Sequence, residues 1–173
     1  MEENQPKTGK YALNFGIILG IVSIVFSIML FTMDMHYERN TAVQIISLIL
    51  AAAAIVLAIS SFKKANGGFL TLSEAMKIGT GVALIAGILG LLYFFIQSNF
   101  IEPDYWDKAY EIGKQTALEN NPQLTEEQID QGIEMQKKFS WLFYPIGLII
   151  NIIIGLVLGL IIGLIMKKQK PAY

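Results

Sequence analysis

Charged and apolar positions are strongly segregated along this chain. Four stretches contain no Asp, Glu, Lys or Arg: residues 11–33, 40–62, 78–101 and 139–166. Each stretch exceeds the roughly 20 apolar residues that an α-helix needs to cross a bilayer core of about 30 Å. All the charge therefore lies between and beyond these stretches. The pattern excludes a water-soluble fold and predicts four membrane-spanning helices at about 11–33, 41–62, 76–101 and 141–166.

The segment between the last two spans, residues 102–138, contains two further helical patterns. Apolar residues recur at helical spacing through 103–119, and Asn120-Asn121-Pro122 then ends the run. A second helix begins at Thr125, because Thr125-x-x-Gln128 has the spacing of a capping box, and it runs nearly continuously toward the fourth span. We therefore expect one all-α membrane domain over 1–173, a four-helix bundle with a two-helix extracytoplasmic segment.

The loop before the third span predicts where that helix begins. Asn66-Gly67-Gly68 is typical of a turn, and Thr71-x-x-Glu74 is a candidate capping box. The helix should start near Leu72, several residues before its uncharged stretch. Its first turn then lies at the membrane interface, where Lys77 can extend toward water and the headgroups.

With four spans, both termini lie on the same side of the membrane. The segments on that side hold eight Lys or Arg residues, and those on the other side hold five. Because Lys and Arg accumulate in cytoplasmic loops, we expect both termini in the cytoplasm. The net charge is +5 on the cytoplasmic side and −6 on the outer side. A basic rim anchors the cytoplasmic side at the headgroups, with a specific lipid or protein partner as the alternative: Lys63, Lys64, Lys77, Lys167, Lys168 and Lys170.

Stripes of small residues indicate how the spans pack, because helices in lipid associate largely through close backbone approach. In the first three spans the small residues alternate steps of four and three, which favours left-handed crossings near +20°. The fourth span has a strict spacing of four, which favours a right-handed crossing. This face is either an internal contact or a dimer seam, and its members are Gly147, Asn151, Gly155, Gly159 and Gly163.

Two residues of the fourth span invite specific hypotheses. Asn151 lies near mid-span, so we expect its amide to form a hydrogen bond to another helix; the alternative is a polar point on a solute path. Pro145 lies one turn inside the stretch and predicts a kink, because it removes a backbone donor and crowds the carbonyl of Trp141.

Composition excludes several kinds of chemistry. The chain has no cysteine and one histidine, and the absence of ionisable residues within the four stretches argues against an ion-coupled transporter. No basic footprint for nucleic acid is present. The outer loops carry the best acid–base or hard-cation candidates, for which solvated loop charge is the alternative: Asp34, His36, Glu38, Glu102, Asp104 and Asp107. We predict no catalytic, cofactor-binding or metal-binding residues.

Several segments together resemble domain-of-unknown-function family 4199. They are a two-lysine loop, LSEAMKIG at the third span, NFIEPDYWDK after it, the acidic TEEQIDQGIEMQKKF and a glycine-rich last span ending in MKKQK. The family usually has Phe-Gly-Glu-Ala-Phe-Lys-x-Gly where this chain has Leu72 to Gly79. The resemblance implies small four-helix inner-membrane proteins, found mainly in Bacteroidota, with no established activity. It singles out Glu74 and Lys77, for which a helix cap and an interfacial anchor are the ordinary roles.

These observations lead to a hypothesis about function. We expect a multi-pass protein of a bacterial inner membrane with no enzymatic activity, acting as a structural or interaction subunit in contact with the lipid bilayer. The alternative is an uncoupled channel or permease formed by oligomers. Partners would be a second copy or another membrane protein, and candidate interaction or packing positions are Glu74, Lys77, Asn151, Gly155 and Gly159.

Overall fold

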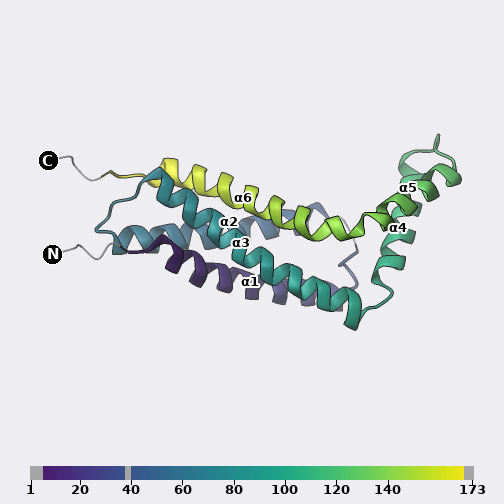
Figure 1. Cartoon of the computed structure of the whole chain (residues 1–173), viewed down its shortest axis with the longest axis horizontal. Coiled ribbons are helices and arrows are strands. Elements are labelled where there is room, and N and C mark those ends of the chain that lie inside the picture. The colour runs from purple at the N-terminus through teal and green to yellow at the C-terminus, as the bar shows by residue number, and fades with distance from the viewer. Residues whose placement is uncertain (1–5, 38–39, 170–173) are drawn as a thin grey trace.

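The computed structural model describes residues 6–37 and 40–169, and Figure 1 shows them as an all-helical chain. Among these residues the extended structure is limited to an isolated bridge, so the predicted all-α fold is confirmed. Glu38 and Lys170 lie outside the described residues. The helices are α1 (Thr8–Thr32), α2 (Thr41–Ala65), α3 (Leu72–Ile96), a π-helical turn (Gln97–Ile101), α4 (Tyr105–Asn120), α5 (Glu126–Lys138), a 3-10 turn (Ser140–Leu142) and α6 (Phe143–Met166).

Four long helices run side by side, and the two shorter ones stand together at one end of them (Figure 1). The long helices are α1, α2, α3 with its π-helical turn, and α6 with its 3-10 turn, and all are apolar enough to cross a membrane. Their ends define two faces of the bundle. The arm face carries α4 and α5, which we call the helical arm, and the termini face carries the start of α1 and the end of α6.

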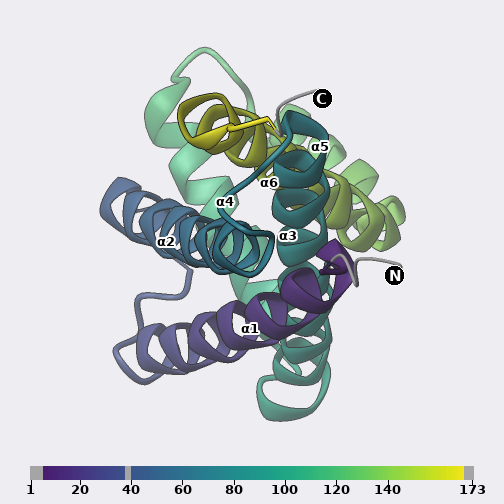
Figure 2. The same cartoon turned by 90° about the vertical axis from the view of Figure 1, so that its left-hand side faces the viewer.

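The third helix is the centre of the bundle. In Figure 2, α1, α2 and α6 surround α3, and α1 and α6 do not contact each other within the described residues. Glycines allow the close approach on both sides. A methyl group built on Gly16 of α1 would come within 2.7 Å of Ile85 Cβ, and one on Gly159 of α6 would come within 2.8 Å of the Ala75 carbonyl oxygen. The helix backbones therefore nearly touch, as expected where dispersion contacts hold helices together in lipid.

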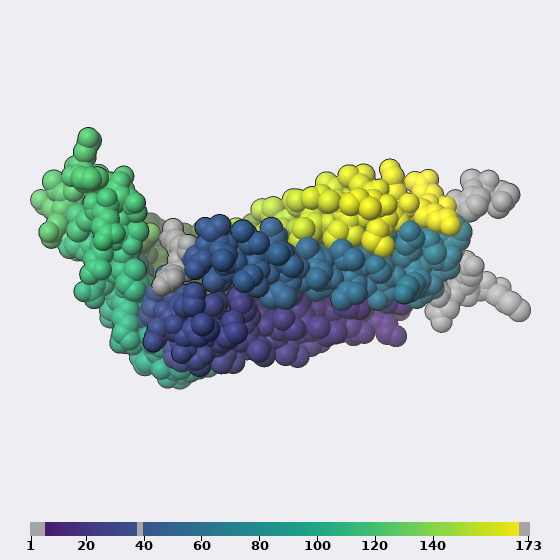
Figure 3. Space-filling view, turned by 180° about the vertical axis from the view of Figure 1, so that it is seen from behind, coloured from purple at the N-terminus to yellow at the C-terminus, as the bar shows by residue number. Residues whose placement is uncertain are grey.

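The second helix lies along the back of the bundle (Figure 3), but only part of its length is buried. Its half toward the termini face buries Ile55, Ala58, Ile59 and Phe62 against the core. Between 41 and 49, in contrast, only Val43 is even partly buried. The core of the molecule therefore lies toward the termini face.

The termini face is closed by backbone and side-chain caps. Leu70 and Lys168 exchange two backbone hydrogen bonds of 2.8 and 2.9 Å, and Leu70 is fully buried. The Lys63 ammonium donates to the Met166 carbonyl oxygen at 2.7 Å, which satisfies one of the free carbonyls at the end of α6. The loop after α2 thus fixes the end of the last helix.

The predicted kink at Pro145 is wrong in its position. Helix α6 begins at Phe143, so Pro145 is the third residue of its first turn. Backbone N–H groups in a first turn have no partner within the helix, so a missing donor there costs no helical hydrogen bond. The interruption precedes the proline, at Phe139 and in the 3-10 turn, where α5 ends and the last span begins.

Candidate functional site

A largely buried carboxylate lies where the third span ends on the arm face. The chain widens into a π-helical turn over Gln97–Ile101, and the Glu102 N–H donates to the Gln97 carbonyl oxygen at 2.8 Å. Single π turns are frequent at functional sites because they change the direction of the side chains that follow. The Glu102 side chain is 12 % exposed and meets the loop between α1 and α2.

That loop turns sharply so that two aromatic residues face Glu102. Asp34 has φ of 55°, the left-handed conformation that Asp tolerates better than most residues, and the Met35 N–H donates to the Leu30 carbonyl oxygen at 2.9 Å. The chain then places His36 and Tyr37 with their ring centroids 4.2 Å apart. The turn at the end of α1 therefore orients both side chains of the site.

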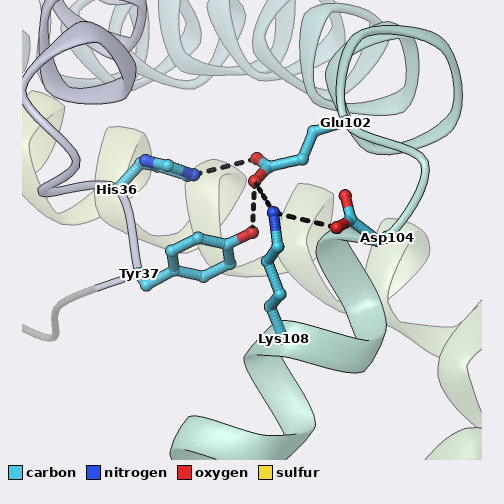
Figure 4. A network of polar contacts seen from close by, with 5 residues as sticks. All are labelled: His36, Tyr37, Glu102, Asp104 and Lys108. Atoms are coloured by element: carbon cyan, nitrogen blue, oxygen red, sulfur yellow. Dashed lines mark hydrogen bonds and ion pairs between the residues drawn. The ribbon is translucent and has the colours of Figure 1, made fainter.

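Five side chains form one connected arm-face network, shown in Figure 4: His36, Tyr37, Glu102, Asp104 and Lys108. The Tyr37 hydroxyl donates to Glu102 Oε1 at 2.6 Å, and His36 Nε2 lies 2.9 Å from Glu102 Oε2. The Lys108 ammonium bridges Glu102 at 3.2 Å and Asp104 at 2.9 Å. The network joins the α1–α2 loop, the end of α3 and the start of α4.

The network sets the charge on its members. Burial by itself would raise the pKa of Glu102, but hydrogen bonds from Tyr37, Lys108 and His36 together lower it below its ordinary value. Glu102 is therefore a carboxylate at neutral pH. Burial, and the hydrogen bond to that carboxylate, raise the pKa of Tyr37 well above its ordinary value, so the phenol keeps its proton. Lys108 also lowers the pKa of Asp104 through a direct hydrogen bond.

The geometry bears on the cation hypothesis, of whose candidates Glu38 lies outside the described residues. The Lys108 ammonium occupies the position between Glu102 and Asp104 that a hard cation would need, and Asp107 lies 3.5 Å from Lys137 instead. Across residues 6–37 and 40–169, His, Asp and Glu side chains form no group of three suited to a metal ion. His36 Nδ1 is buried without a hydrogen-bond partner in that part of the chain. The arm-face network instead holds the α1–α2 loop, the end of α3 and the start of α4 together, and we call it the clamp.

An aromatic cluster continues the clamp toward the last span. Tyr37 and Tyr105 stack with centroids 5.1 Å apart, and Phe94 contacts Tyr105 at 5.2 Å and Phe143 at 5.0 Å. The ring of Trp106 packs edge to face against both Phe94 and Phe143. Rings from α3, α4 and α6 therefore interlock at the level where an aromatic belt meets the headgroups.

Ion pairs join α4 and α5, the two helices of the helical arm. The Lys114 ammonium of α4 lies 2.6 Å from Asp130 of α5, and Lys137 approaches Asp107 and the ring of Tyr110. The α5 capping box at Thr125 is present as predicted. Residues 102–138 carry nine carboxylates and four lysines, so the arm has an acidic excess with most of its carboxylates at the surface.

The residues singled out on α3 and α6 have clear structural roles. The Thr71–Glu74 capping box is present. The Glu74 carboxylate accepts a hydrogen bond from the Thr71 N–H at 2.7 Å. Lys77 is exposed on α3. Gly155 and Gly159 lie against Gly79 and Ala75, so the glycine stripe of α6 is an internal contact with α3 in this chain.

The predicted interhelical hydrogen bond of Asn151 is wrong. Its Nδ2 donates to the Gly147 carbonyl oxygen of its own helix at 3.0 Å, and the side chain is exposed. A carbonyl four residues earlier is always within reach of a short polar side chain on a helix, so this bond forms without a partner helix.

Sequence reasoning placed His36 and Glu102 among the outer candidates but missed Tyr37 and Lys108. Lys108 follows Asp104 by four residues, a spacing that favours an ion pair on a helix and was the available signal. Tyr37 gave no such signal, because its role depends on the fold of the α1–α2 loop.

The fold and its apolar helices define a multi-pass α-helical membrane protein. Within that class, the chain belongs to the family described as "Protein of unknown function (DUF4199)", which it matches over residues 14–168. Comparisons with curated proteins and with solved structures returned no match.

Proposed function

We propose that this protein is a non-enzymatic interaction subunit of a bacterial inner membrane, which presents its helical arm to a partner on the extracytoplasmic side. The observation that carries the proposal is the clamp at the base of the arm. Buried Glu102 and the interlocked rings fix α4 to the ends of α1, α3 and α6. A fixed arm presents its surface in a constant geometry, which reduces the entropy cost of binding.

The surface of the arm indicates the chemistry of the partner. Asp107 is 82 % exposed and Glu126 is 75 % exposed, and Met135 adds an exposed apolar side chain between the charges of α5. Mixed acidic and apolar surface favours a partner with basic side chains around an apolar centre, because complementary potentials accelerate encounter and fix orientation.

The orientation of the proposal rests on the distribution of cations. Lys63, Lys64 and Lys77 lie on the termini face, whereas the arm face is acidic. Positive loops remain in the cytoplasm, which supports cytoplasmic termini and an arm outside.

Site-specific photo-crosslinking in intact cells tests the partner. A photoreactive residue at Met135, exposed on the arm, should yield a discrete crosslinked protein, whereas the same residue at Ile49, exposed on the apolar face of α2, should not. Replacing Glu126, Glu127 and Glu134 by Gln should reduce the Met135 crosslink several-fold, because the basic partner loses its counter-charges. Equal crosslinking from Met135 and Ile49, or an unchanged yield in the neutralised variant, would contradict the proposal.

One observation supports the alternative of a passive path formed by several copies. Asn151 is a polar residue exposed on a membrane-spanning helix, where polar groups usually face the protein interior or water. If several copies lined such a path with Asn151, purified protein in liposomes would release a small neutral solute, and Asn151→Leu would abolish the release.

A further inference from the structure

One side of the central helix is uncovered. Helices α1, α2 and α6 occupy three sides of α3, and the fourth side remains open between α1 and α6 (Figures 1 and 2). Toward the termini face this side forms an open groove of about 620 Å³. It is lined by Leu72, Ser73, Met76, Lys77, Thr80 and Gly81 of α3 and by Leu156 of α6.

The glycine contacts explain why the groove exists. Gly159 and Gly163 bring α6 against Ala75 on one side of α3, and Gly81 brings Ala12 of α1 against the other. Because α1 and α6 approach the α3 backbone so closely on two opposite sides, the face of α3 that carries Met76 and Thr80 stays open. The groove opens sideways into the bilayer, so its natural occupant is a molecule that resides there.

The groove combines an apolar floor with a cation at one end. Leu72, Met76 and Leu156 supply the apolar lining, and Lys77 lies about 8 Å along the axis from the start of α3. Within the described residues the Lys77 ammonium has no ion pair, since the nearby Glu74 carboxylate caps the helix. A lysine one turn inside the helix can extend its ammonium to the headgroup level, where an anionic group can pair with it.

A second polar group adjoins the apolar lining. Thr80 Oγ1 is buried and has no hydrogen-bond partner in the described part of the chain. Threonine in a helix populates two side-chain rotamers, and because Thr80 lines the groove, a change of χ1 would turn its hydroxyl toward a ligand there. There it can donate to an ester carbonyl of a ligand that lies along α3, while Ser73 lies on the headgroup side.

We propose that this groove is a binding site for an anionic glycerophospholipid. One acyl chain lies along Met76 and Leu156, and the phosphate binds the Lys77 ammonium at the termini face. Charge complementarity favours an anionic over a zwitterionic headgroup, because Lys77 is the only charged residue among those that line the groove. The apolar lining of the groove contacts the acyl chain. Free phosphate has no such chain and could bind only through Lys77.

The test uses the full chain in mild detergent, with bound lipid counted by native mass spectrometry. Dipalmitoyl phosphatidylglycerol should bind about fivefold more tightly than phosphatidylcholine with the same chains. Lys77→Gln should abolish this preference, and Lys77→Arg should retain it. Lys64→Gln removes the same charge from the same face outside the groove and should leave the preference unchanged. Leu156→Trp, which narrows the groove, should weaken binding of both lipids.

Three results would overturn the site. Equal loss of preference in Lys64→Gln and Lys77→Gln would mean that the whole basic rim attracts anions. Equal binding of dihexanoyl and dipalmitoyl phosphatidylglycerol would show that the groove holds no acyl chain. An unchanged preference in Lys77→Gln would remove the proposed headgroup contact. The melting temperature of each variant without added lipid separates loss of the site from loss of the fold.

Discussion

The Tyr37 hydroxyl and Glu102 Oε1 lie 2.6 Å apart, although 65 residues separate them in the chain. Their hydrogen bond joins the loop after the first span to the end of the third. Glu102 also contacts His36 and Lys108, so one carboxylate receives bonds from two segments. A side chain that satisfies so many partners while largely buried should matter more to stability than its neighbours on the surface.

Glu102→Gln should lower the free energy of unfolding by about 2 kcal/mol, because the amide cannot accept all the bonds and leaves buried donors unsatisfied. Denaturant unfolding in detergent, followed by tryptophan fluorescence, measures the loss. Asp104→Asn is the matched control, since its carboxylate is 59 % exposed and should matter little. Equal losses in the two variants would contradict a central role for Glu102.

Stability should decrease at acid pH because Glu102 becomes protonated. The pKa of Glu102 is lowered in the folded protein, so its contribution is fully present above the ordinary glutamate value of about 4.3 and is lost as the pH falls below it. The melting temperature of the wild type should therefore decrease from pH 5 to pH 3 more steeply than that of Glu102→Gln. Parallel curves would show that other carboxylates dominate the acid limb.

Gly159→Ala should destabilise the contact between α3 and α6. The new methyl group would lie 2.8 Å from the Ala75 carbonyl oxygen, and backbone cannot yield as a side-chain end can. Overpacking of this kind costs about 1 to 3 kcal/mol. Gly147→Ala in the same helix meets Leu91 Cδ2 at 3.6 Å, an ordinary contact, and should be neutral or slightly stabilising. Thermal unfolding of both variants in one detergent provides the comparison.

The two capping boxes should differ in their effects. Thr71→Ala and Thr125→Ala each remove the hydroxyl that accepts the N3 backbone N–H, a loss of about 1 kcal/mol of helix stability. Helix α3 is the centre of the bundle, so Thr71→Ala should lower the global melting temperature. Thr125→Ala should instead increase hydrogen exchange in α5 alone. Exchange that rises equally throughout the chain in both variants would argue against local opening of α5.

The absence of cysteine makes the orientation directly testable. Single variants Glu134→Cys on the arm and Lys64→Cys on the termini face each provide one thiol. With cytoplasmic termini, a membrane-impermeant maleimide added to spheroplasts should label Glu134→Cys and should label Lys64→Cys only after lysis. The reverse pattern would place the arm in the cytoplasm and would also withdraw the extracytoplasmic partner.

The fold was readable from sequence to the extent that it depends on local pattern. Membrane-length apolar stretches specify helices directly, because a backbone in lipid must satisfy its own hydrogen bonds. The capping boxes at Thr71 and Thr125 are equally local, and both are present. The arrangement around α3 was less accessible from sequence. The regular small-residue spacing of the third span runs through Gly79, Ala83, Ala86 and Gly90, whereas Gly81 and Gly87, outside it, pack closely against Ala12 and Asn151.

The candidate site was readable only in part, for a related reason. A histidine and several carboxylates in the outer loops indicated a polar site, but their pairing depends on a π-helical turn and on a left-handed Asp34. Neither feature has a dependable sequence signal. Lys108, which pairs with both Glu102 and Asp104, lies beyond the loop in α4.

The central place of α3 also orders the assembly of the protein in time. Because α1 and α6 both dock on α3 and not on each other, the first three spans can form a complete packing unit before the last is synthesised. The emerging α6 then meets an existing surface at Ala75 and Gly79, and the strand-like pairing of Leu70 with Lys168 closes only when synthesis is nearly finished. A chain that lacks its final span would therefore expose the small-residue surface of α3 at Ala75 and Gly79 to lipid.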